Sequence, residues 1–242
     1  MSPSATATPS KPNHNMDSVV HEAQTAFRSA RLKYIKMDEA DERIKAFLPQ
    51  VEGDPVVLAL ASPALLRPSG KKELDWFAEQ QAKAYLGVAI CLLPSDEGEA
   101  VCTRTPAGDS NGEKNGESRD SKEQKKPTII GTMCLGWGGI APSTAHHRTA
   151  SIGITLSSAH HNRGYGREAI NWMLDWAFKH GAMHTVSICA YSYNERGAHL
   201  YQDIGFQPEG RRREVVWFNR KWYDELWFGM TEHEWEKLRG MS

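Results

Sequence analysis

The segment that most constrains this chain is a turn with two glycines, placed between a strand-like run and a helix-like run. It reads Asn-Arg-Gly-Tyr-Gly-Arg-Glu-Ala-Ile over residues 162–170. Residues 150–156 before it are rich in apolar and β-branched side chains, and after it apolar side chains recur at helical spacing to about His180. The sequence therefore predicts a strand, a glycine turn and the start of a helix in direct succession.

Such a turn is suited to hold an anion. Gly164 and Gly166 have no side chains, so several backbone N–H groups can converge on one ligand at the helix N-terminus, where the helix dipole favours negative charge. Arg163 and Arg167 add charged donors for phosphate oxygens. The turn is neither a Walker loop nor a Gly-x-Gly-x-x-Gly motif. It predicts a phosphate-bearing ligand, although a plain helix-starting turn explains two glycines about equally well.

Hydrophobic periodicity and turn residues predict the other elements. Strands are expected at 30–36, 85–93, 129–137, 150–156, 184–191, 206–218 and 221–230. Helices are expected from Asp38, as N-cap, to Leu48, where Pro49 stops the helix, and at 71–84, 162–180 and 194–204. A last helix begins at Thr231, with Glu234 at the capping-box position. Residues 56–61 are short and apolar, and both a strand and a buried loop fit them.

Two segments lack the apolar side chains that a folded core needs. Residues 1–16 are rich in Ser, Thr, Pro and Asn, which predicts a disordered tail; a transit peptide is the alternative, but the stretch has no arginine and no amphipathic period. Residues 94–128 contain no aromatic side chain and predict a disordered insertion in a hairpin. Residues 17–242 are otherwise expected to form one domain.

Composition excludes several classes of protein. The formal net charge of −1 argues against a mainly electrostatic binder of nucleic acid or membrane surfaces. Apolar runs such as residues 85–93 are too short to span a bilayer, and no apolar signal region is present, so a cytoplasmic protein is expected, with the nucleus as the other compartment. The four cysteines lack Cys-x-x-Cys spacing, and the histidine pairs at 146–147 and 160–161 flank a strand, so no metal site is predicted.

Further residues recur around the turn in a characteristic order. They are Ile152-Gly153, Arg163 to Gly166, Glu168-Ala169-Ile170, Trp176-Ala177-Phe178, Asn194, Leu200-Tyr201, Gly205-Phe206, Glu209-Gly210 and Trp222-Tyr223-Asp224. This set resembles the GNAT superfamily of N-acetyltransferases, in particular the branch of ribosomal-protein and polyamine acetyltransferases. The resemblance implies a single α/β (α+β) domain with a mixed, mostly antiparallel sheet flanked by helices and splayed between strands 150–156 and 184–191.

The resemblance also implies a cosubstrate, acetyl-coenzyme A, and residues that hold it. The backbone of the glycine turn would bind its pyrophosphate, and the edge of the preceding strand would pair with its pantetheine arm. The cofactor-binding residues expected in this way are Arg163, Gly164, Tyr165, Gly166, Arg167 and Glu168 in the turn, Ile154, Thr155 and Leu156 in the strand, and Asn194, which contacts the pantetheine or caps a helix.

Tyr201 is the expected catalytic residue, since the matching tyrosine of the family donates a proton to the thiolate sulfur. It lies seven residues after Asn194, about two helical turns, so both side chains share one helix face. A packed core tyrosine is the alternative. The general base stays open: Ser151 stands where relatives often have an acidic residue, which leaves water or a residue of the N-terminal helices, with Glu73 and Glu79 as candidates.

The predicted function is acetyl transfer from acetyl-coenzyme A to a primary amine, on a small molecule or a peptide, by direct attack. Cys189 is expected to be a buried hydrophobe and not an acetyl carrier. The alternatives are a non-catalytic coenzyme A-binding scaffold protein and a transferase of longer acyl groups. The sequence leaves the acceptor, and a homodimer, open.

Overall fold

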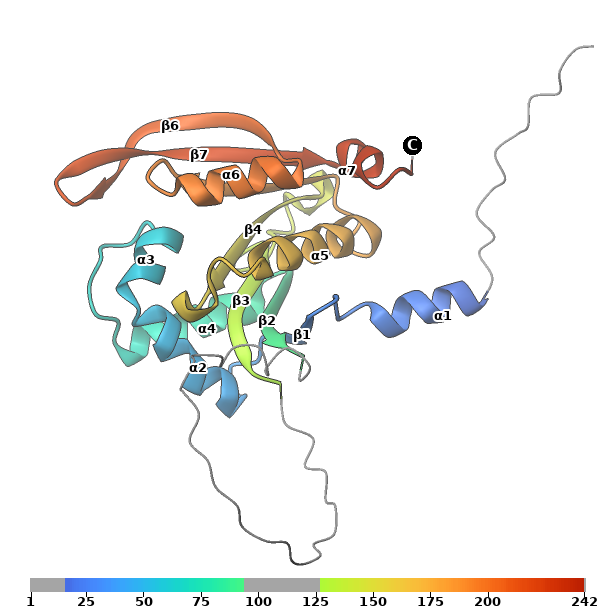
Figure 1. Ribbon diagram of the computed structural model, residues 1–242, viewed down its shortest axis with the longest axis horizontal. Helices are drawn as coiled ribbons and strands as arrows, with labels where there is room; N and C mark the ends of the chain where they lie inside the picture. Colours follow the sequence, from blue (N-terminus) through green and yellow to red (C-terminus); the bar gives the residue numbers. More distant parts are fainter. Residues whose placement is uncertain (1–15, 94–126, 242) are drawn as a thin grey trace, which may run out of the picture.

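The computed structural model describes residues 16–93 and 127–241 (Figure 1). Two short 3-10 turns, Ala145–His147 and Ser158–His160, flank strand β4. The helices and strands are α1 (Met16–Thr25), β1 (Leu32–Lys36), α2 (Glu42–Glu52), α3 (Pro55–Ala61), α4 (Lys71–Lys83), β2 (Leu86–Leu92), β3 (Ile129–Leu135), β4 (Thr149–Leu156), α5 (Tyr165–Lys179), β5 (Thr185–Tyr191), α6 (Glu195–Ile204), β6 (Gln207–Phe218), β7 (Lys221–Thr231) and α7 (Glu232–Leu238).

The strands form one sheet in the order β1-β2-β3-β4-β5-β7-β6. Every neighbouring pair is antiparallel except β4 and β5, which are parallel, so the mixed, mostly antiparallel sheet is confirmed. β2 and β3 are direct neighbours, and the segment between them therefore joins two adjacent strands. The predicted disordered tail, apart from Met16, and residues 94–126 of the predicted insertion lie outside the described residues.

The sheet opens between its two central strands. β4 and β5 are paired only where Thr149–Ser151 meets Thr185–Ser187, and β4 continues to Leu156 without this partner. Two halves result, β1 to β4 with α5, and β5, β7 and β6 with α6. Figure 1 shows α6, β6 and β7 apart from β1 to β4. The predicted splay is confirmed, and it leaves one edge of β4 free along its C-terminal half.

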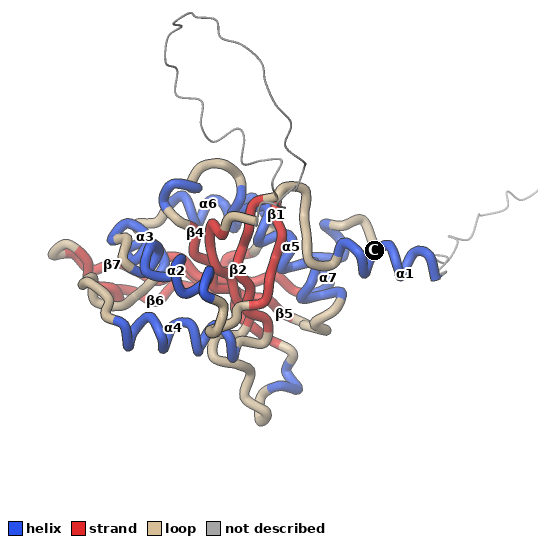
Figure 2. Tube along the Cα trace, turned by 90° about the horizontal axis from the view of Figure 1, so that it is seen from below, coloured by secondary structure: helices blue, strands red, loops and turns tan. Residues whose placement is uncertain are grey.

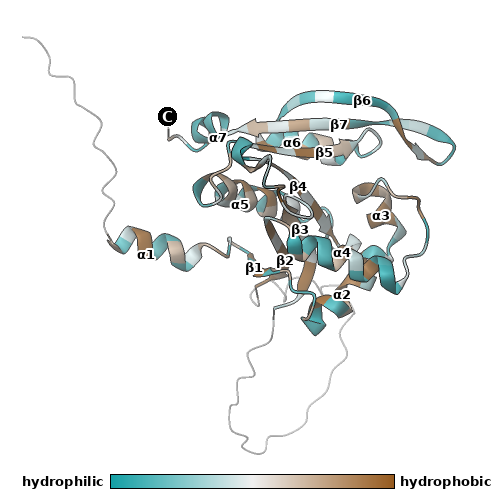
Figure 3. Cartoon of the chain, turned by 180° about the vertical axis from the view of Figure 1, so that it is seen from behind, coloured by the Kyte–Doolittle hydropathy of each residue, from teal (hydrophilic) through white to brown (hydrophobic). Residues whose placement is uncertain are grey.

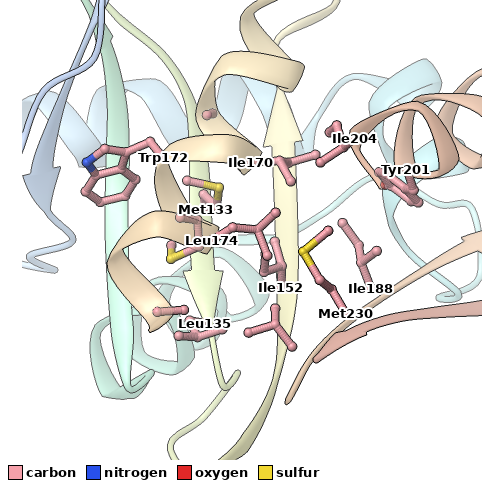
Figure 4. Packing of buried hydrophobic residues seen from close by; sticks show 14 of the residues in the cluster. Met133, Leu135, Ile152, Ile170, Trp172, Leu174, Ile188, Tyr201, Ile204 and Met230 are labelled. Atoms are coloured by element: carbon pink, nitrogen blue, oxygen red, sulfur yellow. The ribbon is translucent and has the colours of Figure 1, made fainter. Parts of the chain in front are cut away.

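Both faces of the β1–β4 half are covered by helices. Ile90 packs in the cluster that contains Ile170 of α5, whereas its neighbour Ala89 packs with Ile44 of α2 and Ala78 of α4. This alternation follows from the period of two in a strand. Figure 2 shows α2 and α4 to one side of the strands, and Figure 4 shows Ile152 of β4 beneath Ile170 of α5. The covered faces explain why β2 and β3 are apolar almost throughout.

The N-terminal helices differ from the sequence prediction in two ways. α2 begins after Asp41, whose carboxylate accepts a hydrogen bond from the Arg43 N–H at 2.8 Å, and it continues through Pro49 to Glu52. An interior proline costs about 3 kcal/mol. The burial of Phe47 and Val51, on either side of it, offsets this cost. Asp38 therefore does not cap the helix, and Pro49 does not stop it.

Residues 56–61 form neither a strand nor a buried loop, because Pro55–Ala61 is helix α3. The Asp54 side chain caps it by accepting from the N–H groups of Val56 and Val57, and Pro55 occupies the first turn, where proline suits a helix. α3 is almost wholly apolar (Figure 3). Within residues 16–93 and 127–241, no helix is both long and apolar enough to cross a membrane.

Candidate active site

The glycine turn has the backbone geometry of an anion site. Gly164 is in the left-handed region, at φ 81° and ψ −3°, and serves as N-cap of α5. A Cβ on Gly166 would meet the side chains of Leu156 and Leu200 at 3.7 Å, which is ordinary contact. Packing within the protein therefore does not require glycine at 166, and the missing side chain leaves the helix N-terminus accessible from the adjoining cavity.

A partly buried carboxylate anchors this turn to the residues just before β1. Glu168 accepts hydrogen bonds from the Arg31 backbone N–H at 2.7 Å, from Arg31 Nε at 2.8 Å and from Ser29 Oγ at 2.7 Å. Arg31 also donates to the Arg163 carbonyl at 3.0 Å and lies over the Tyr165 ring. Burial alone would raise the pKa of Glu168, but these hydrogen bonds and the Arg31 charge lower it on balance.

A cavity of about 570 Å³ lies beside the turn, between β4, α3, α5 and α6. Among the predicted residues, those that line it are Ile154, Thr155, Leu156, Gly164, Tyr165, Gly166, Arg167, Asn194 and Tyr201. Arg163 and Glu168 do not line it. The Glu168 N–H already donates to the Gly164 carbonyl at 3.1 Å, so it belongs to the helix and not to a ligand site.

Basic side chains stand around the same cavity. Arg167 pairs with Asp203 of α6 at 3.1 Å, and about half of its side chain remains exposed. Arg196, which the sequence reasoning did not identify, lines the cavity and donates to the Asn162 side chain at 2.9 Å. These guanidinium groups give the glycine-turn end of the cavity a positive potential that suits phosphates.

The free edge of β4 presents backbone groups to the opening in the sheet. The Ser151 carbonyl and the Ser157 N–H bond toward β3, so odd-numbered residues of β4 direct their backbone groups to that side. The backbone groups of Ile154 therefore point to the opposite edge, which β5 leaves uncovered beyond Ser151. An extended ligand with amide groups can pair there as an added strand does.

Tyr201 is packed in the core and also lines the first cavity. The side chain is 8% exposed, and its ring makes edge contacts with Phe206 and Phe228. Burial raises the pKa of the Tyr201 phenol, and the nearby Cys189 raises it further by a smaller amount. Within the described residues the hydroxyl has no hydrogen-bond partner, unlike a core tyrosine that satisfies a neighbouring carbonyl. Figure 4 shows Tyr201 on α6 beside Ile204.

Asn194 is the N-cap of α6, which was one of its two expected roles. Its Oδ1 accepts from the Gly197 N–H at 3.0 Å, and its Nδ2 donates to the Leu60 carbonyl at 3.3 Å. The adjacent Tyr193 hydroxyl donates to the Ala59 carbonyl at 2.5 Å. Both bonds tie α3 across the opening of the sheet, so Asn194 holds a wall of the cavity in addition to lining it.

A second cavity, of about 550 Å³, lies on the other side of α3. It is bounded by α2, α4 and the chain between α3 and α4, and it meets the first cavity along four shared lining residues, Val57, Ala61, Ile154 and Thr155. Two ligands that enter from opposite sides can therefore meet over β4. The segment 71–84, expected by resemblance to help select the substrate, contributes Glu73, Trp76, Phe77 and Gln81 to this cavity.

The carboxylates named as candidate bases are engaged elsewhere. Glu73 pairs with Arg67 at 2.9 Å and caps α4 through the Gly70 N–H, and Glu79 is paired with Lys83. Glu52 at the end of α2 is the carboxylate that the sequence reasoning missed. No local pattern marks it, because the cavity around it is assembled from α2, α3, α4 and β4.

Of the other reactive side chains, Cys189 lines neither cavity, whereas His160 and His161 line the first. Burial raises the pKa of Cys189 to about 11, so its thiolate is scarce near neutral pH. Both histidines make local contacts: His161 Nε2 lies 3.0 Å from the Leu156 carbonyl, and His160 Nδ1 lies 2.6 Å from Ser157 Oγ. The residues that the structure describes contain no group of three or more side chains able to hold a metal ion.

Comparison of the sequence with known proteins gives partial matches to N-acetyltransferases. An uncharacterised N-acetyltransferase of SPbeta prophage origin from Bacillus subtilis is 31% identical over 87 residues, 36% of this chain and 49% of that protein. Spermidine N(1)-acetyltransferase of Vibrio cholerae is 31% identical over 78 residues, 32% of this chain and 45% of that protein. The chain thus spans about half the length of the curated relatives that it matches.

Comparison of the fold extends the likeness to most of the chain. The crystal structure of Vibrio cholerae spermidine N-acetyltransferase with CoA and spermine aligns at a TM-score of 0.62 and 15% identity, covering 86% of this chain and 99% of that one. A GNAT-family acetyltransferase from Bacillus anthracis aligns at 0.59 and 16% identity, covering 86% and 98%. The family model described as "Acetyltransferase (GNAT) domain" matches residues 31–207. The chain therefore belongs to the GNAT acetyltransferase family.

Proposed function

We propose that this protein transfers the acetyl group of acetyl-coenzyme A to the nitrogen of a primary amine, with Tyr201 as the general acid. The observation that carries the proposal is Tyr201, which lines the same cavity as the glycine turn and the free edge of β4 and whose hydroxyl has no hydrogen-bond partner among the described residues. A proton donor, an anion site and a strand edge are the three features that a pantetheine thioester requires.

The residues of the first cavity fit coenzyme A chemically. The N–H groups at the start of α5, with Arg167 and Arg196 beside them, suit the pyrophosphate. The outward backbone groups of Ile154 suit the amides of the pantetheine arm. The cosubstrate supplies an acetyl group activated as a thioester. The protein holds it with its acetyl end toward the place where the two cavities meet.

Tyr201 protonates the sulfur that departs when the amine forms its bond to the acetyl carbon. Its raised pKa keeps the phenol protonated throughout the neutral range, so a donor is always present. Cys189 lines neither cavity and carries little thiolate. Both facts favour direct attack by the amine over an acetyl-cysteine route.

The test is thiol release from acetyl-coenzyme A with a panel of amines, peptides and polyamines, measured for the wild type and for Tyr201→Phe. We expect amine-dependent release whose kcat falls at least about 100-fold in the variant, while acetyl-coenzyme A affinity changes little. Tyr191→Phe is the matched control, because Tyr191 is a buried tyrosine that lines neither cavity. Binding without turnover of any amine would favour a scaffold role instead.

A further inference from the structure

Glu52 is an unpaired carboxylate at the wall of the second cavity. It is the last residue of α2, and its backbone carbonyl is fixed by the Ser69 hydroxyl at 3.0 Å. Its carboxyl group has no hydrogen bond or ion pair with the described residues, and burial raises its pKa to about 7. The negative end of the α2 dipole acts in the same direction. Such a carboxyl group takes up and releases a proton near neutral pH.

Gln81 is a second polar side chain of the same cavity with an unused group. It is 2% exposed, and its Nε2 lies 3.4 Å from Thr132 Oγ1. Its Oε1 is buried and has no partner among the described residues. An unpaired buried carbonyl oxygen is costly unless a ligand donates to it. A small turn of the Gln81 amide toward the cavity would present this oxygen to an N–H of a bound ammonium group.

The walls of the second cavity are mainly apolar and aromatic. One wall is an aromatic group of Trp76, Phe77 and Trp137. The centroid of the Trp137 ring lies 5.1 Å from that of Phe77 and 6.0 Å from that of Trp76, and Leu65 also lines the cavity. Aromatic faces attract an ammonium group and also bury the apolar body that carries it. A ligand with one polar end and an apolar remainder suits these walls.

The charge of the lining indicates how many positive charges the ligand carries. Its charged side chains are Glu52, Arg67 and Glu73, and the last two neutralise each other in an ion pair. Glu52 alone remains to balance a cation. A polyamine would bring further ammonium groups into an apolar site with no carboxylate to pair them, which is costly. The cavity therefore favours a single ammonium group.

We propose that Glu52 is the general base of the acetyl transfer and that the acceptor is a monoamine whose primary ammonium group, carried on an apolar or aromatic body, is held by Glu52 and Gln81. This inference rests on the proposed function, and it names the base and the substrate class of the same site. It places the amine on one side of Ile154 and Thr155 and the thioester on the other.

The protons balance along this route. The ammonium group gives one proton to Glu52, and the neutral nitrogen uses its lone pair to form the C–N bond while the C–S bond breaks. The departing sulfur takes a proton from Tyr201. The nitrogen, positively charged after attack, loses its second proton, which restores the phenol. Glu52 then releases its proton to water, so the products are an amide, a free thiol and one proton.

The test of the base compares Glu52→Gln with Glu42→Gln, which removes the same charge from an exposed position on the same helix. With 2-phenylethylamine as acceptor, kcat/KM at pH 7 should fall at least about 100-fold in the first variant. It should stay within about twofold of wild type in the second, because an exposed ion pair contributes little. Acetyl-coenzyme A affinity, measured by titration calorimetry, should be unchanged in both, which shows that the cofactor side remains folded.

The pH profile separates a base from a merely structural residue. Wild-type activity should rise as pH increases through about 7, where Glu52 loses its proton. In Glu52→Gln that step should vanish, and the rate should follow the neutral fraction of the free amine. The other charged or titratable side chains that line this cavity are Arg67 and Glu73, which pair with each other, and Cys134, whose pKa burial raises to about 11. Glu52→Asp should keep the rise of activity with pH, although its maximal rate should be lower than that of the wild type.

The acceptor panel contrasts 2-phenylethylamine with spermidine and with a short peptide that has a free N-terminus. We expect kcat/KM for the monoamine to exceed that for spermidine at least tenfold. A preference for spermidine or the peptide would overturn the acceptor class. A Glu52→Gln variant that turns over normally and keeps the pH step would overturn the base. If no amine releases thiol from the wild type, the proposed function fails and this inference fails with it.

Discussion

Gly166→Asp should raise the stability of the fold while it weakens the binding of the cosubstrate. The backbone at 166 is helical, and a new Cβ meets only ordinary contacts at 3.7 Å, so an aspartate is accommodated. A carboxylate in the first helical turn is stabilised by the dipole, and aspartate is a better helix former than glycine. We expect the free energy of unfolding to rise by about 0.5–1 kcal/mol.

The same carboxylate should weaken cosubstrate binding strongly. It would stand among the N–H groups that we assign to the pyrophosphate, and two like charges 4 Å apart repel by about 4 kcal/mol near a protein surface. Even half of that repulsion corresponds to a loss of affinity of more than tenfold, since about 1.4 kcal/mol is a factor of ten. We therefore expect the Kd for acetyl-coenzyme A to rise about 30-fold or more, and to recover partly at high salt.

Calorimetric titration and urea unfolding measure the two effects, with Gly166→Ala as the uncharged control. Alanine should raise stability by about 0.5–1 kcal/mol and change the Kd by less than about threefold. The reasoning is refuted if aspartate and alanine bind acetyl-coenzyme A equally well, because the phosphates then do not lie at the start of α5. It is also refuted if alanine destabilises the fold, because position 166 then lacks the space that the structure shows.

Three further predictions follow from individual contacts. Glu168→Gln should lower the free energy of unfolding by about 1–2 kcal/mol near pH 7, by urea unfolding, because it weakens the bonds from Arg31 and Ser29. Since the folded-state pKa of Glu168 is lowered, its stabilisation is complete above the ordinary glutamate pKa and should disappear as pH falls through the lowered value, where variant and wild type converge. Tyr193→Phe removes the bond to Ala59 and should speed amide hydrogen exchange in α3 while α7 stays unchanged; equal rates in α3 would show that this bond does not hold the helix. Gly164→Ala should destabilise the fold by about 1–2 kcal/mol, since an L-residue there is held in the left-handed region, and an unchanged urea midpoint would contradict that geometry.

The sequence predicted the parts of the fold that depend on local patterns. The glycine turn, the apolar period of α5 and the alternation in the strands are local patterns of the sequence, and most of the residues predicted from them to bind the cosubstrate line the first cavity. Asn194 and Tyr201 share a helix face because of their spacing, and both line the predicted cavity. The helix at 55–61 was also readable in principle, because Asp54 and Pro55 are an N-cap and a first-turn residue.

The rest depends on contacts between distant segments. Pro49 remains inside a helix because Phe47 and Val51 are buried against other elements, and no local rule supplies that information. The partner of the Glu168 carboxylate could not be predicted either, because Arg31 lies far away in the sequence. Glu52 and Gln81 line the same cavity only because α2, α4 and β4 pack together in the folded protein. The raised pKa of Glu52 and the unpaired oxygen of Gln81 both result from burial, which cannot be read from a single sequence.

The most direct test of acetyl transfer is a single-turnover experiment with the radiolabelled acetyl group of acetyl-coenzyme A. The wild-type protein, saturated with this cosubstrate, is mixed separately with 2-phenylethylamine, spermidine and the short peptide and quenched over time, and label on the amine and on the protein is counted. The account predicts that label passes to the amine with one thiol released per acetyl group, with none on the protein, and that Tyr201→Phe slows this step. Label on Cys189, or bound acetyl-coenzyme A that never labels any amine, would contradict it.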